Sequence, residues 1–349
     1  MRLKLCQWIH TVAPAPRANG ARRAPSTSPQ MGLLSTGPEL TAGVALAAAA
    51  WLFVERARSR DRRTTSWTAK AGWDAKRAAF LGSASVDSLM VITDFDATLT
   101  SGDSEQCHDM LGASKLLSPQ FRAEFAPLLD WTSNVDIDGV EWWDKAHELM
   151  VRHATPPREL IPRLVREASM KPRPGALEML KRLEELGVPV LIVSAGVSDV
   201  IEEFLRQHGA MSENVTICSN RLNYEADSTP KSVAPSPPIT SFTKEYAYSS
   251  ARSFFAEHAK RRSILQLGDS LTDVDPAKKV PYEALLSIGF LNSRPDATRH
   301  EETFDAVVMG NSGSLHPVTD IIDEIAPTRG ILRSFSSMSP SPKPAQRAG

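Results

Sequence analysis

The chain has 349 residues, of which 42% are apolar and 23% charged, and its formal net charge is −1 at pH 7. This length predicts about two domains with enough apolar residues for a sizeable core. The first 80 residues hold 13 Lys and Arg against 4 Asp and Glu, a net charge of +9, and the remainder hold 27 against 37, a net charge of −10. An acidic globular part argues against a nucleic-acid polymer as partner, and it is compatible with a small ligand whose charge a metal ion offsets.

Cysteine and histidine show no metal-binding pattern in the sequence. Cys6, Cys107 and Cys218 have no CxxC spacing, so neither a disulfide framework nor a zinc site is indicated. The scattered thiols favour a reducing compartment. His108 and His147 have no His or Cys partner at ligand spacing, which favours polar packing over metal binding.

Residues 1–84 are predicted to form a leader before the folded part. The first 38 residues contain five basic residues and no acidic one, a composition typical of an organellar transit peptide and equally of a disordered leader. Residues 40–54 are an apolar run followed by five arginines, and the run is shorter than the roughly 20 residues of a membrane-spanning helix. A membrane tether and a cleaved or loosely packed helix are therefore both open. Residues 331–349 are rich in Ser and Pro, which predicts a disordered tail.

Short apolar runs alternate with helical patterns between about residues 85 and 330. The runs are continuous, as is typical of strands covered on both faces in a parallel sheet, and they span 89–93, 188–193, 215–218, 263–267, 284–288 and 305–309. One helix follows Pro174 and stops at Gly187, and another stops at Gly209. The alternation predicts an α/β fold with a doubly wound parallel sheet, in which ligands bind beyond the carboxyl ends of the strands.

Residues 105–170 interrupt this alternation with helical patterns such as SPQFRAEFAPLL and GVEWWDKAHELMVRH. We expect the insertion to form a small helical cap after the first strand. A cap over the strand ends would exclude water and select substrates. The predicted core then consists of residues 85–104 and 171–330.

Polar residues follow the predicted strands at four points: Asp94 and Asp96 in DFDATLTSG, Ser194 in VSAG, Lys244 in SFTKEYA, and Asp269 and Asp273 in GDSLTD. Each has a use if the ligand is a phosphate ester. Asp94 can attack phosphorus, and Asp96 can protonate the leaving alcohol and then activate water. Ser194 and the amides after it can hold phosphate oxygens, with Lys244 as a point charge.

The last motif supplies carboxylates for a cation. Asp269 can complete an oxygen shell around Mg2+, and Asp273 can orient ligands or Lys244. Each feature alone is weak, since a DxD after a strand is commonly a turn and a lone lysine is usually solvated. Their joint occurrence, in order and at element ends, is specific. Phe95, between the two aspartates, is expected to point into the core and to keep both carboxylates on one side.

These motifs resemble those of the haloacid dehalogenase-like phosphatases, whose four motifs are matched by DFDATL, VSAG, Lys244 and GDSLTD. The resemblance implies Asp94 as nucleophile and Asp96 as acid and base. It also implies Mg2+ bound by Asp94, the main-chain carbonyl of Asp96, and Asp269. An aspartate at position 96 favours phosphatase over dehalogenase chemistry.

A closer resemblance spans about residues 88–325. The segments that carry it are VITDFDATLT, QCHDMLGASKLL, VEWWDKAHELM, VPVLIVSAGVSDVIEEFLRQHG, NVTICSNRLNY, and ILQLGDSLTDVDPA with SIGFLN. They resemble the cytosolic type III family of pyrimidine and 7-methylguanosine 5'-nucleotidases. The resemblance implies hydrolysis of nucleoside 5'-monophosphates such as CMP, UMP or 7-methyl-GMP through an aspartyl-phosphate. The family's phosphate-side Ser-Ala falls on Ser194 and Ala195, and its lysine on Lys244.

The chain departs from this family at several positions of the predicted pocket. Asp136 in VDID matches a cap glutamate that binds the nucleoside, with a side chain one methylene shorter. Ala97 stands where Met is usual, and Asp109 where Asn is frequent. WWDKAH is similar to the 7-methylguanosine-type members, and Trp143 is the candidate to stack on a cationic base. Trp142 and Trp143 are adjacent on a helix, so we expect at least one of them to pack in the core.

Other functions are also compatible with the sequence. One is a different small-molecule phosphatase resembling phosphoserine phosphatase, although QCHDMLG and VEWWDKAH favour the nucleotidase. A nucleoside phosphotransferase is another, because any hydroxyl that enters can accept the phosphoryl group. A non-catalytic, membrane-tethered scaffold has no need of the aspartate pair. The family resemblance implies a cytoplasmic location, whereas the basic leader keeps mitochondrion, plastid and membrane as alternatives.

Overall fold

The computed structural model describes residues 65–129, 139–292 and 297–326. They belong to one of the two compact units into which the chain divides, Phe53–Gly349. The apolar run 40–54, the predicted tail and Asp136 lie outside the described residues. Within the described ranges, no helix has the length and apolar character needed to cross a membrane.

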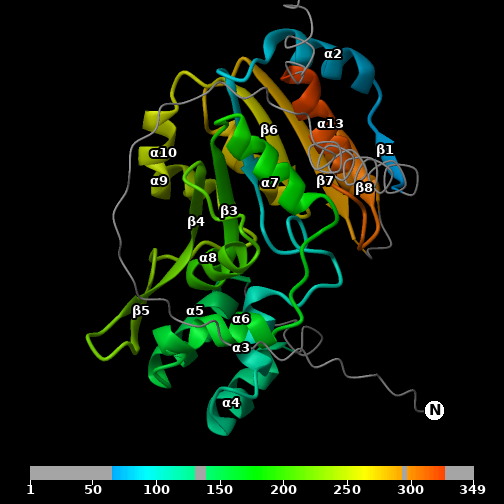
Figure 1. Ribbon diagram of the computed structural model, residues 1–349. Coiled ribbons are helices and arrows are strands. Elements are labelled where there is room, and N and C mark those ends of the chain that lie inside the picture. Colours follow the sequence, from blue (N-terminus) through cyan, green and yellow to red (C-terminus); the bar gives the residue numbers. More distant parts are fainter. Residues whose placement is uncertain (1–64, 130–138, 293–296, 327–349) are drawn as a thin grey trace, which may run out of the picture. The chain divides into compact units, whose positions relative to one another are not determined.

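Eight strands of the described residues form one sheet in the order β1-β8-β7-β6-β2-β3-β4-β5 (Figure 1). The parallel ones are β2 (Leu89–Thr93), β3 (Val190–Val197), β4 (Val215–Tyr224), β6 (Ser263–Gly268), β7 (Ala284–Leu291) and β8 (Ala306–Met309). Each overlaps one of the six predicted apolar runs, so the prediction of a parallel sheet is confirmed. β2 is central, because Val91 pairs with Val190 on one side and with Leu265 on the other.

Two short antiparallel strands at the sheet edges were not predicted. β1 (Trp67–Ala69) pairs with β8, and β5 (Pro230–Ala234) pairs with β4. β1 and the following helix α2 (Trp73–Ser83) fall in the range predicted as leader. Trp73 and Phe80 are nevertheless buried in the main core. The predicted start of the folded part at residue 85 was therefore wrong, because residues 67–83 already complete the sheet and its cover.

Helices cover both faces of the sheet, as the doubly wound prediction requires. Leu89 and Val91 of β2 share an apolar cluster with α2, α7 (Ala176–Glu185) and α13 (His316–Ile325). Met90 points to the opposite face and packs with α9 (Ala247–Ser250) and α10 (Arg252–Glu257). α8 (Ser198–Gln207) packs beside β3 and β4. The shorter helices of the core are η2 (Lys244–Tyr246), η3 (Leu271–Val274), α11 (Asp275–Lys278) and α12 (Thr298–Thr303).

Glycines end two of these helices as predicted. Gly187 follows α7 with φ +62°, and Gly209 follows α8 with φ +64°. This left-handed conformation is the one in which glycine commonly closes a helix. Each helix therefore ends at its glycine, and the chain changes direction there toward β3 or β4.

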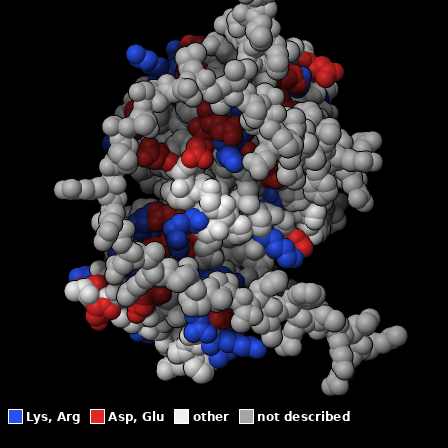
Figure 2. Space-filling model, viewed as in Figure 1, with Lys and Arg blue, Asp and Glu red and all other residues white. Residues whose placement is uncertain are grey.

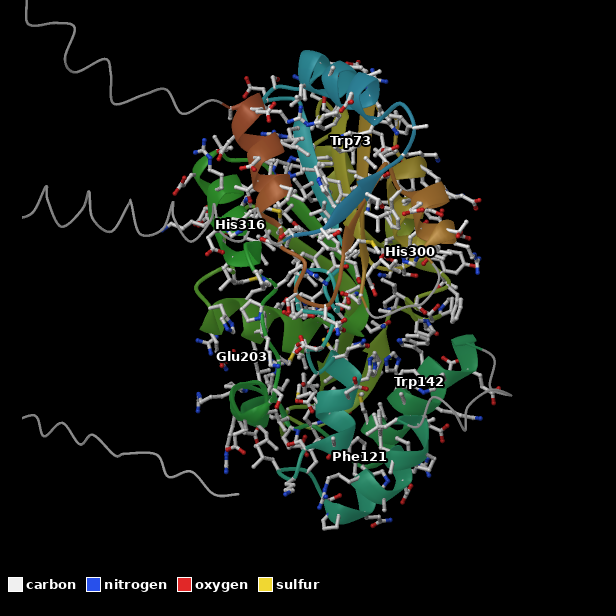
Figure 3. All side chains as sticks on the ribbon, turned by 90° about the vertical axis from the view of Figure 1, so that its right-hand side faces the viewer. Trp73, Phe121, Trp142, Glu203, His300 and His316 are labelled. Carbon is white, nitrogen blue, oxygen red and sulfur yellow. The ribbon has the colours of Figure 1, made fainter. Side chains whose placement is uncertain are left out.

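The insertion between β2 and β3 forms the cap, with helices α3 (Cys107–Ala113), α4 (Pro119–Leu129), α5 (Gly139–Arg152) and α6 (Ile161–Glu167) and the turn η1 (Arg158–Leu160). Its interior is apolar and aromatic, since Phe121, Phe125 and Trp142 are all buried. Figure 3 shows Phe121 and Trp142 on the cap helices and Trp73 at the far end of the sheet. The cap therefore lies at the carboxyl ends of the parallel strands.

Candidate active site

A cavity of about 580 Å³ lies where the cap meets the carboxyl ends of the central strands. Its lining includes Asp94, Asp96, Trp143, Ser194, Ala195, Lys244 and Asp269, all predicted from the sequence. Asp273 is buried behind Lys244, with which it forms an ion pair. The cap adds Gln106, His108, Asp109 and Trp142 to the lining. Asp136, the predicted nucleoside ligand, lies outside the described residues.

Lys244 joins the first and last motifs at the base of the cavity. Its ammonium nitrogen Nζ lies 2.6 Å from Asp94 Oδ1 and 2.6 Å from Asp273 Oδ1. The other oxygen of Asp273, Oδ2, accepts the Ser270 N–H at 2.7 Å. Burial alone would lower the pKa of Lys244, but the charges of Asp273 and Asp94 outweigh burial and raise it. Lys244 is therefore a permanent cation held in a fixed position beside Asp94.

Asp94 of the first motif is buried, and Asp96 is partly buried. Burial raises the pKa of Asp94, the charge of Lys244 opposes the rise, and Asp273 and Asp269 add to it. Phe95, between Asp94 and Asp96, is fully buried and packs edge-on against Phe204, with ring centroids 5.4 Å apart. The prediction that Phe95 points into the core is confirmed.

Asp96 is held by the first helix of the cap. The Cys107 N–H at the start of α3 points at both carboxylate oxygens of Asp96, at 3.3 and 3.5 Å. Burial and the charge of Asp94 raise the pKa of Asp96 to about 7, although the Cys107 hydrogen bonds oppose the rise. A carboxyl group with this pKa can both give and take a proton near neutral pH.

Carboxylates gather where a cation would be needed. One oxygen each from Asp94, Asp269 and Asp273 lie within 4.8 Å of one another. Asp269 sits at the carboxyl end of β6, and its main-chain carbonyl lies 2.8 Å from Nε2 of the buried His300. Figure 3 shows His300 on the core side, above the cap. A hard divalent cation with oxygen ligands suits this donor set.

Residues 194–196 near the end of β3, where the register against β4 shifts, approach Asp96 closely and are tied on two sides. Ser194 Oγ accepts the Gly196 N–H at 3.0 Å. A Cβ at Gly196 would lie 3.1 Å from Asp96 Oδ2 and 2.9 Å from Cys107 Sγ, so only glycine fits there without displacing them. The Ala195 carbonyl accepts the Trp143 indole N–H and the Asn220 side-chain amide, both at 2.9 Å.

The two tryptophans of α5 differ in their partners. Trp142 donates its indole N–H to the Leu128 carbonyl inside the cap at 2.9 Å, whereas Trp143 donates to Ala195 of the core. Both side chains are buried, and both line the cavity. Their rings meet edge to face, with centroids 4.8 Å apart. The expectation of core packing for at least one of them is confirmed.

His108 and His147 form a buried pair beside these tryptophans. Their Nε2 atoms are 3.5 Å apart, and the His108 ring meets the Trp142 ring edge to face. Burial lowers the pKa of His108 to about 3 and that of His147 to about 4. Both imidazoles are therefore neutral at physiological pH, and their contact is polar packing.

Some residues that organise the site had not been singled out from the sequence. Asn220 is fully buried and bridges Ala195 to Ile239. Its side-chain oxygen accepts the Ile239 N–H at 2.9 Å, and its side-chain amide donates to the Ile239 carbonyl at 2.8 Å. Two polar residues, Ser219 and Asn220, follow the apolar run VTIC where the parallel pairing with β3 ends, and this was the available signal. Asn292, which directly follows β7, carried the same signal, whereas Arg173 carried no comparable one. Both side chains contact the backbone after Asp96.

Comparisons with known proteins agree with this geometry. The family model described as "Pyrimidine 5'-nucleotidase (UMPH-1)" matches residues 90–326. The 7-methylguanosine phosphate-specific 5'-nucleotidase of Gallus gallus is 32% identical over 253 residues, which cover 67% of this chain and 86% of the relative. The Homo sapiens protein of the same name is 28% identical, with 68% and 85% covered.

Similarity to a solved structure extends to the fold. The crystal structure of cytosolic 5'-nucleotidase IIIB bound to cytidine superposes with a TM-score of 0.62 at 23% identity, covering 74% of this chain and 92% of that one. At this identity the likeness shows a shared fold. The family match covers more than half of the chain and includes the residues of the predicted motifs that line the cavity. The chain therefore belongs to the pyrimidine 5'-nucleotidase family, a family of phosphoric monoester hydrolases built on a haloacid dehalogenase-like fold.

Proposed function

We propose that this 5'-nucleotidase hydrolyses nucleoside 5'-monophosphates with Mg2+ as cofactor and through an aspartyl-phosphate on Asp94. The carrying observation is the position of Asp94 between Lys244 and the carboxylate of Asp269, in a cavity that the cap closes with aromatic rings. Acidic and basic side chains are interspersed on the face shown in Figure 2. This distribution suits a small substrate better than a polyanion.

The residues present fit a magnesium ion. Asp94, Asp269 and the main-chain carbonyl of Asp96 would hold it. Asp273 lies in the same carboxylate cluster, but Lys244 and the Ser270 N–H engage its two oxygens, so we assign it the role of orienting Lys244. When bound, the ion supplies positive charge that offsets the buried carboxylates and the phosphate oxygens.

In the proposed first step, a carboxylate oxygen of Asp94 attacks phosphorus as the bond from phosphorus to the ribose 5' oxygen breaks. Asp96 gives its proton to that oxygen, and the nucleoside leaves. In the second step, Asp96 removes a proton from water, which attacks phosphorus and breaks the bond to Asp94. Inorganic phosphate leaves, and Asp96 is protonated again. The pKa of Asp96, about 7, suits both of its tasks.

Four further groups serve the phosphate and the nucleoside in this proposal. Ser194, the backbone of Ala195 and the ammonium of Lys244 bind the phosphate oxygens. Trp143 lines the space beyond them, where an indole suits a cationic base. The curated relatives are named for 7-methylguanosine phosphate, and the solved relative binds cytidine. The proposed substrates are therefore 7-methyl-GMP and the pyrimidine nucleotides CMP and UMP.

A phosphate-release screen tests the proposal. The purified chain is assayed with CMP, UMP, 7-methyl-GMP, AMP and phosphoserine, with Mg2+ and with EDTA. We expect Mg2+-dependent release from at least one of the first three, and none from the Asp94→Asn variant. Full activity of Asp94→Asn would defeat the mechanism, whereas preference for phosphoserine would assign a different substrate class. Added nucleoside that becomes a new monophosphate would reveal phosphotransfer.

We propose a cytosolic location, because a Caenorhabditis elegans relative, 27% identical over 261 residues, is named putative cytosolic 5'-nucleotidase 3. The basic leader supplies the competing possibility. A fusion of residues 1–80 to a fluorescent reporter distinguishes them. A diffuse signal supports the cytosol, and a mitochondrial, plastid or membrane signal contradicts it.

A further inference from the structure

Arg173 is a buried cation among main-chain carbonyls. Its side chain is 1% exposed, and its guanidinium donates to the carbonyls of Thr98 at 2.8 Å and Gly313 at 3.0 Å and to that of Ala97. Burial lowers its pKa to about 10, against the effect of Asp269 and Asp103, so Arg173 is charged at neutral pH. Burying a charge among carbonyls is costly, so a function for it is expected.

One function is to fix the backbone directly after Asp96. Ala97 has φ +58°, a conformation that side chains other than glycine rarely adopt. Its carbonyl accepts Arg173 Nη2 and the Asn292 side-chain amide, the latter at 3.1 Å, and its N–H donates to Thr100 Oγ1 at 2.8 Å. The Asp96 carbonyl shares its planar peptide unit with the Ala97 N–H, so the bond to Thr100 fixes its direction directly. Arg173 and Asn292 hold the next peptide unit through the Ala97 carbonyl and so support the same turn of the backbone.

Asn292 links Arg173 to the carboxylate of Asp269 on the other side of the site. Its Oδ1 accepts Arg173 Nη2 at 2.7 Å, and its Nδ2 lies 3.5 Å from Asp269 Oδ2. The amide packs on the bare backbone of Gly102, where a Cβ would fall 2.2 Å from Asn292 Oδ1. Arg173 and Asn292 thus connect the backbone of Ala97, directly after the Asp96 carbonyl, with the carboxylate of Asp269.

We propose that Arg173 and Asn292 are positioning residues that set the affinity of this site for its divalent cation. Both hold the Ala97 carbonyl and so limit how the preceding Asp96 carbonyl can turn, and Asn292 also holds the Asp269 carboxylate. The two ligands would thereby keep the directions that a bound Mg2+ requires, although neither Arg173 nor Asn292 would contact the ion. Groups that orient metal ligands commonly change metal affinity by roughly 10- to 100-fold when they are lost. This inference rests on the proposed Mg2+ cofactor.

Arg261 provides a matched control at the opposite end of β2. It also donates to main-chain carbonyls, with Nη1 bonded to Val86 at 2.6 Å and to Leu89 at 2.8 Å. It therefore resembles Arg173 in its bonding but lies away from the cavity. Arg173→Lys and Arg261→Lys each keep the charge and lose the planar fork of donors. Asn292→Ala removes the amide and leaves both arginines intact.

The experiment measures Mg2+ binding to the full-length chain by isothermal titration calorimetry without substrate, together with the melting temperature and the Mg2+ dependence of kcat. We expect Arg173→Lys and Asn292→Ala to bind Mg2+ roughly 10-fold more weakly or worse, and Arg261→Lys to stay within about twofold of wild type. Saturating Mg2+ should restore much of the kcat of Asn292→Ala, which a general loss of stability would not allow.

Two results separate the possible failures. Wild-type Mg2+ affinity in folded Asn292→Ala overturns the inference and leaves the proposed function intact. If Arg173→Lys does not fold, the Mg2+ affinity of Asn292→Ala alone tests the inference. A wild-type chain that hydrolyses nucleotides but binds no Mg2+ overturns both the cofactor proposal and this inference.

Discussion

The indole N–H of Trp143 in the cap donates to the carbonyl oxygen of Ala195 in the core at 2.9 Å. This bond links the cap to the end of β3 that we propose to bind phosphate. The Ala195 carbonyl also accepts a hydrogen bond from the Asn220 side-chain amide, so the end of β3 stays tied to the core if the tryptophan bond is lost. Trp143 can therefore set the position of the cap without being needed to fold the end of β3.

Trp143→Phe should raise KM for the nucleotide while keeping an aromatic ring in the cavity. Loss of one hydrogen bond of about 1 kcal/mol corresponds to roughly a fivefold rise. Trp142→Phe is the control, because its indole bonds the Leu128 carbonyl within the cap. It should lower the melting temperature with little change in KM. Steady-state kinetics and thermal unfolding of both variants check this, and equal KM changes would contradict it.

Asp96→Asn should reduce kcat for nucleotides by about 100- to 10,000-fold, the usual range for loss of a general acid and base. The amide oxygen can still accept the Cys107 N–H, so the fold should persist. The phosphorylation step should be less impaired with p-nitrophenyl phosphate, whose leaving group needs no proton. Asp109→Asn, in the same cavity, is the control and should change kcat far less. Equal losses in single-turnover phosphorylation of both substrates would argue against Asp96 as the acid.

Gly196→Ala should impair the chemistry with a smaller effect on stability. The new Cβ would lie 2.9 Å from Cys107 Sγ and 3.1 Å from Asp96 Oδ2, so the proposed acid and base, Asp96, must shift. A displacement of this kind costs roughly 10- to 100-fold in kcat/KM. Gly82→Ala in α2, where a Cβ meets nothing within 4 Å, should leave activity unchanged. Wild-type kcat/KM in Gly196→Ala would contradict this prediction.

The buried histidine pair should make the protein less stable in acid. Burial lowers the pKa of His108 to about 3 and that of His147 to about 4, whereas an unfolded histidine titrates near 6.5. The unfolded chain therefore binds more protons below pH 6.5, and stability is lost as the pH falls. The loss is roughly 2 kcal/mol per histidine at pH 5. Urea unfolding at pH 7.5 and pH 5 measures it.

The matched variant for this pH effect is His108→Gln with His147→Gln, which removes both titrating groups. We expect the double variant to lose less stability between the two pH values than wild type does. His258→Gln is the control, because His258 is only partly buried. An unchanged pH dependence in the double variant would show that other groups dominate.

Removing residues 1–64 should preserve the described fold, whereas removing residues 1–84 should not. The longer deletion takes away β1 and the buried side chains of Trp73 and Phe80. Losing one large buried aromatic side chain costs about 3 to 5 kcal/mol. Circular dichroism and urea unfolding of both variants test this. A shorter chain, residues 85–349, with wild-type stability would show that β1 and α2 are dispensable.

The sequence predicted the parallel sheet because its strands are buried on both faces and so read as continuous apolar runs. β1 escaped this pattern, since all three of its residues are exposed and only pairing with β8 makes them a strand. β5 is likewise a short edge strand that turns back on β4. Edge strands depend on what they pair with, and that information lies far away in the chain.

In the candidate site, too, some residues could be predicted from the sequence and others could not. Asp94, Asp96, Lys244 and Asp269 were predicted because each lies directly after a strand or at the start of a helix. The supporting contacts were not, because they join distant residues through main-chain carbonyls. Arg173 and Ala97 are 76 positions apart, and Asn292 and Ala97 are 195. A side chain that binds a carbonyl leaves no complementary side chain for sequence reasoning to find.

The antiparallel direction of β1 determines how a fusion partner would sit on this enzyme. Trp67 pairs with Val308 near the carboxyl end of β8, and the Thr65 hydroxyl accepts the Ser314 N–H. The chain thus enters the fold on the catalytic edge of the sheet, four strand spacings of about 4.8 Å from β2. α13 runs back from that edge, and Ala326 beyond its end is bonded to Arg182 near the end of α7. An anchor attached directly after Ala326 would therefore lie away from the cavity, whereas a partner attached directly before Thr65 would lie on the edge of the sheet that carries the cavity.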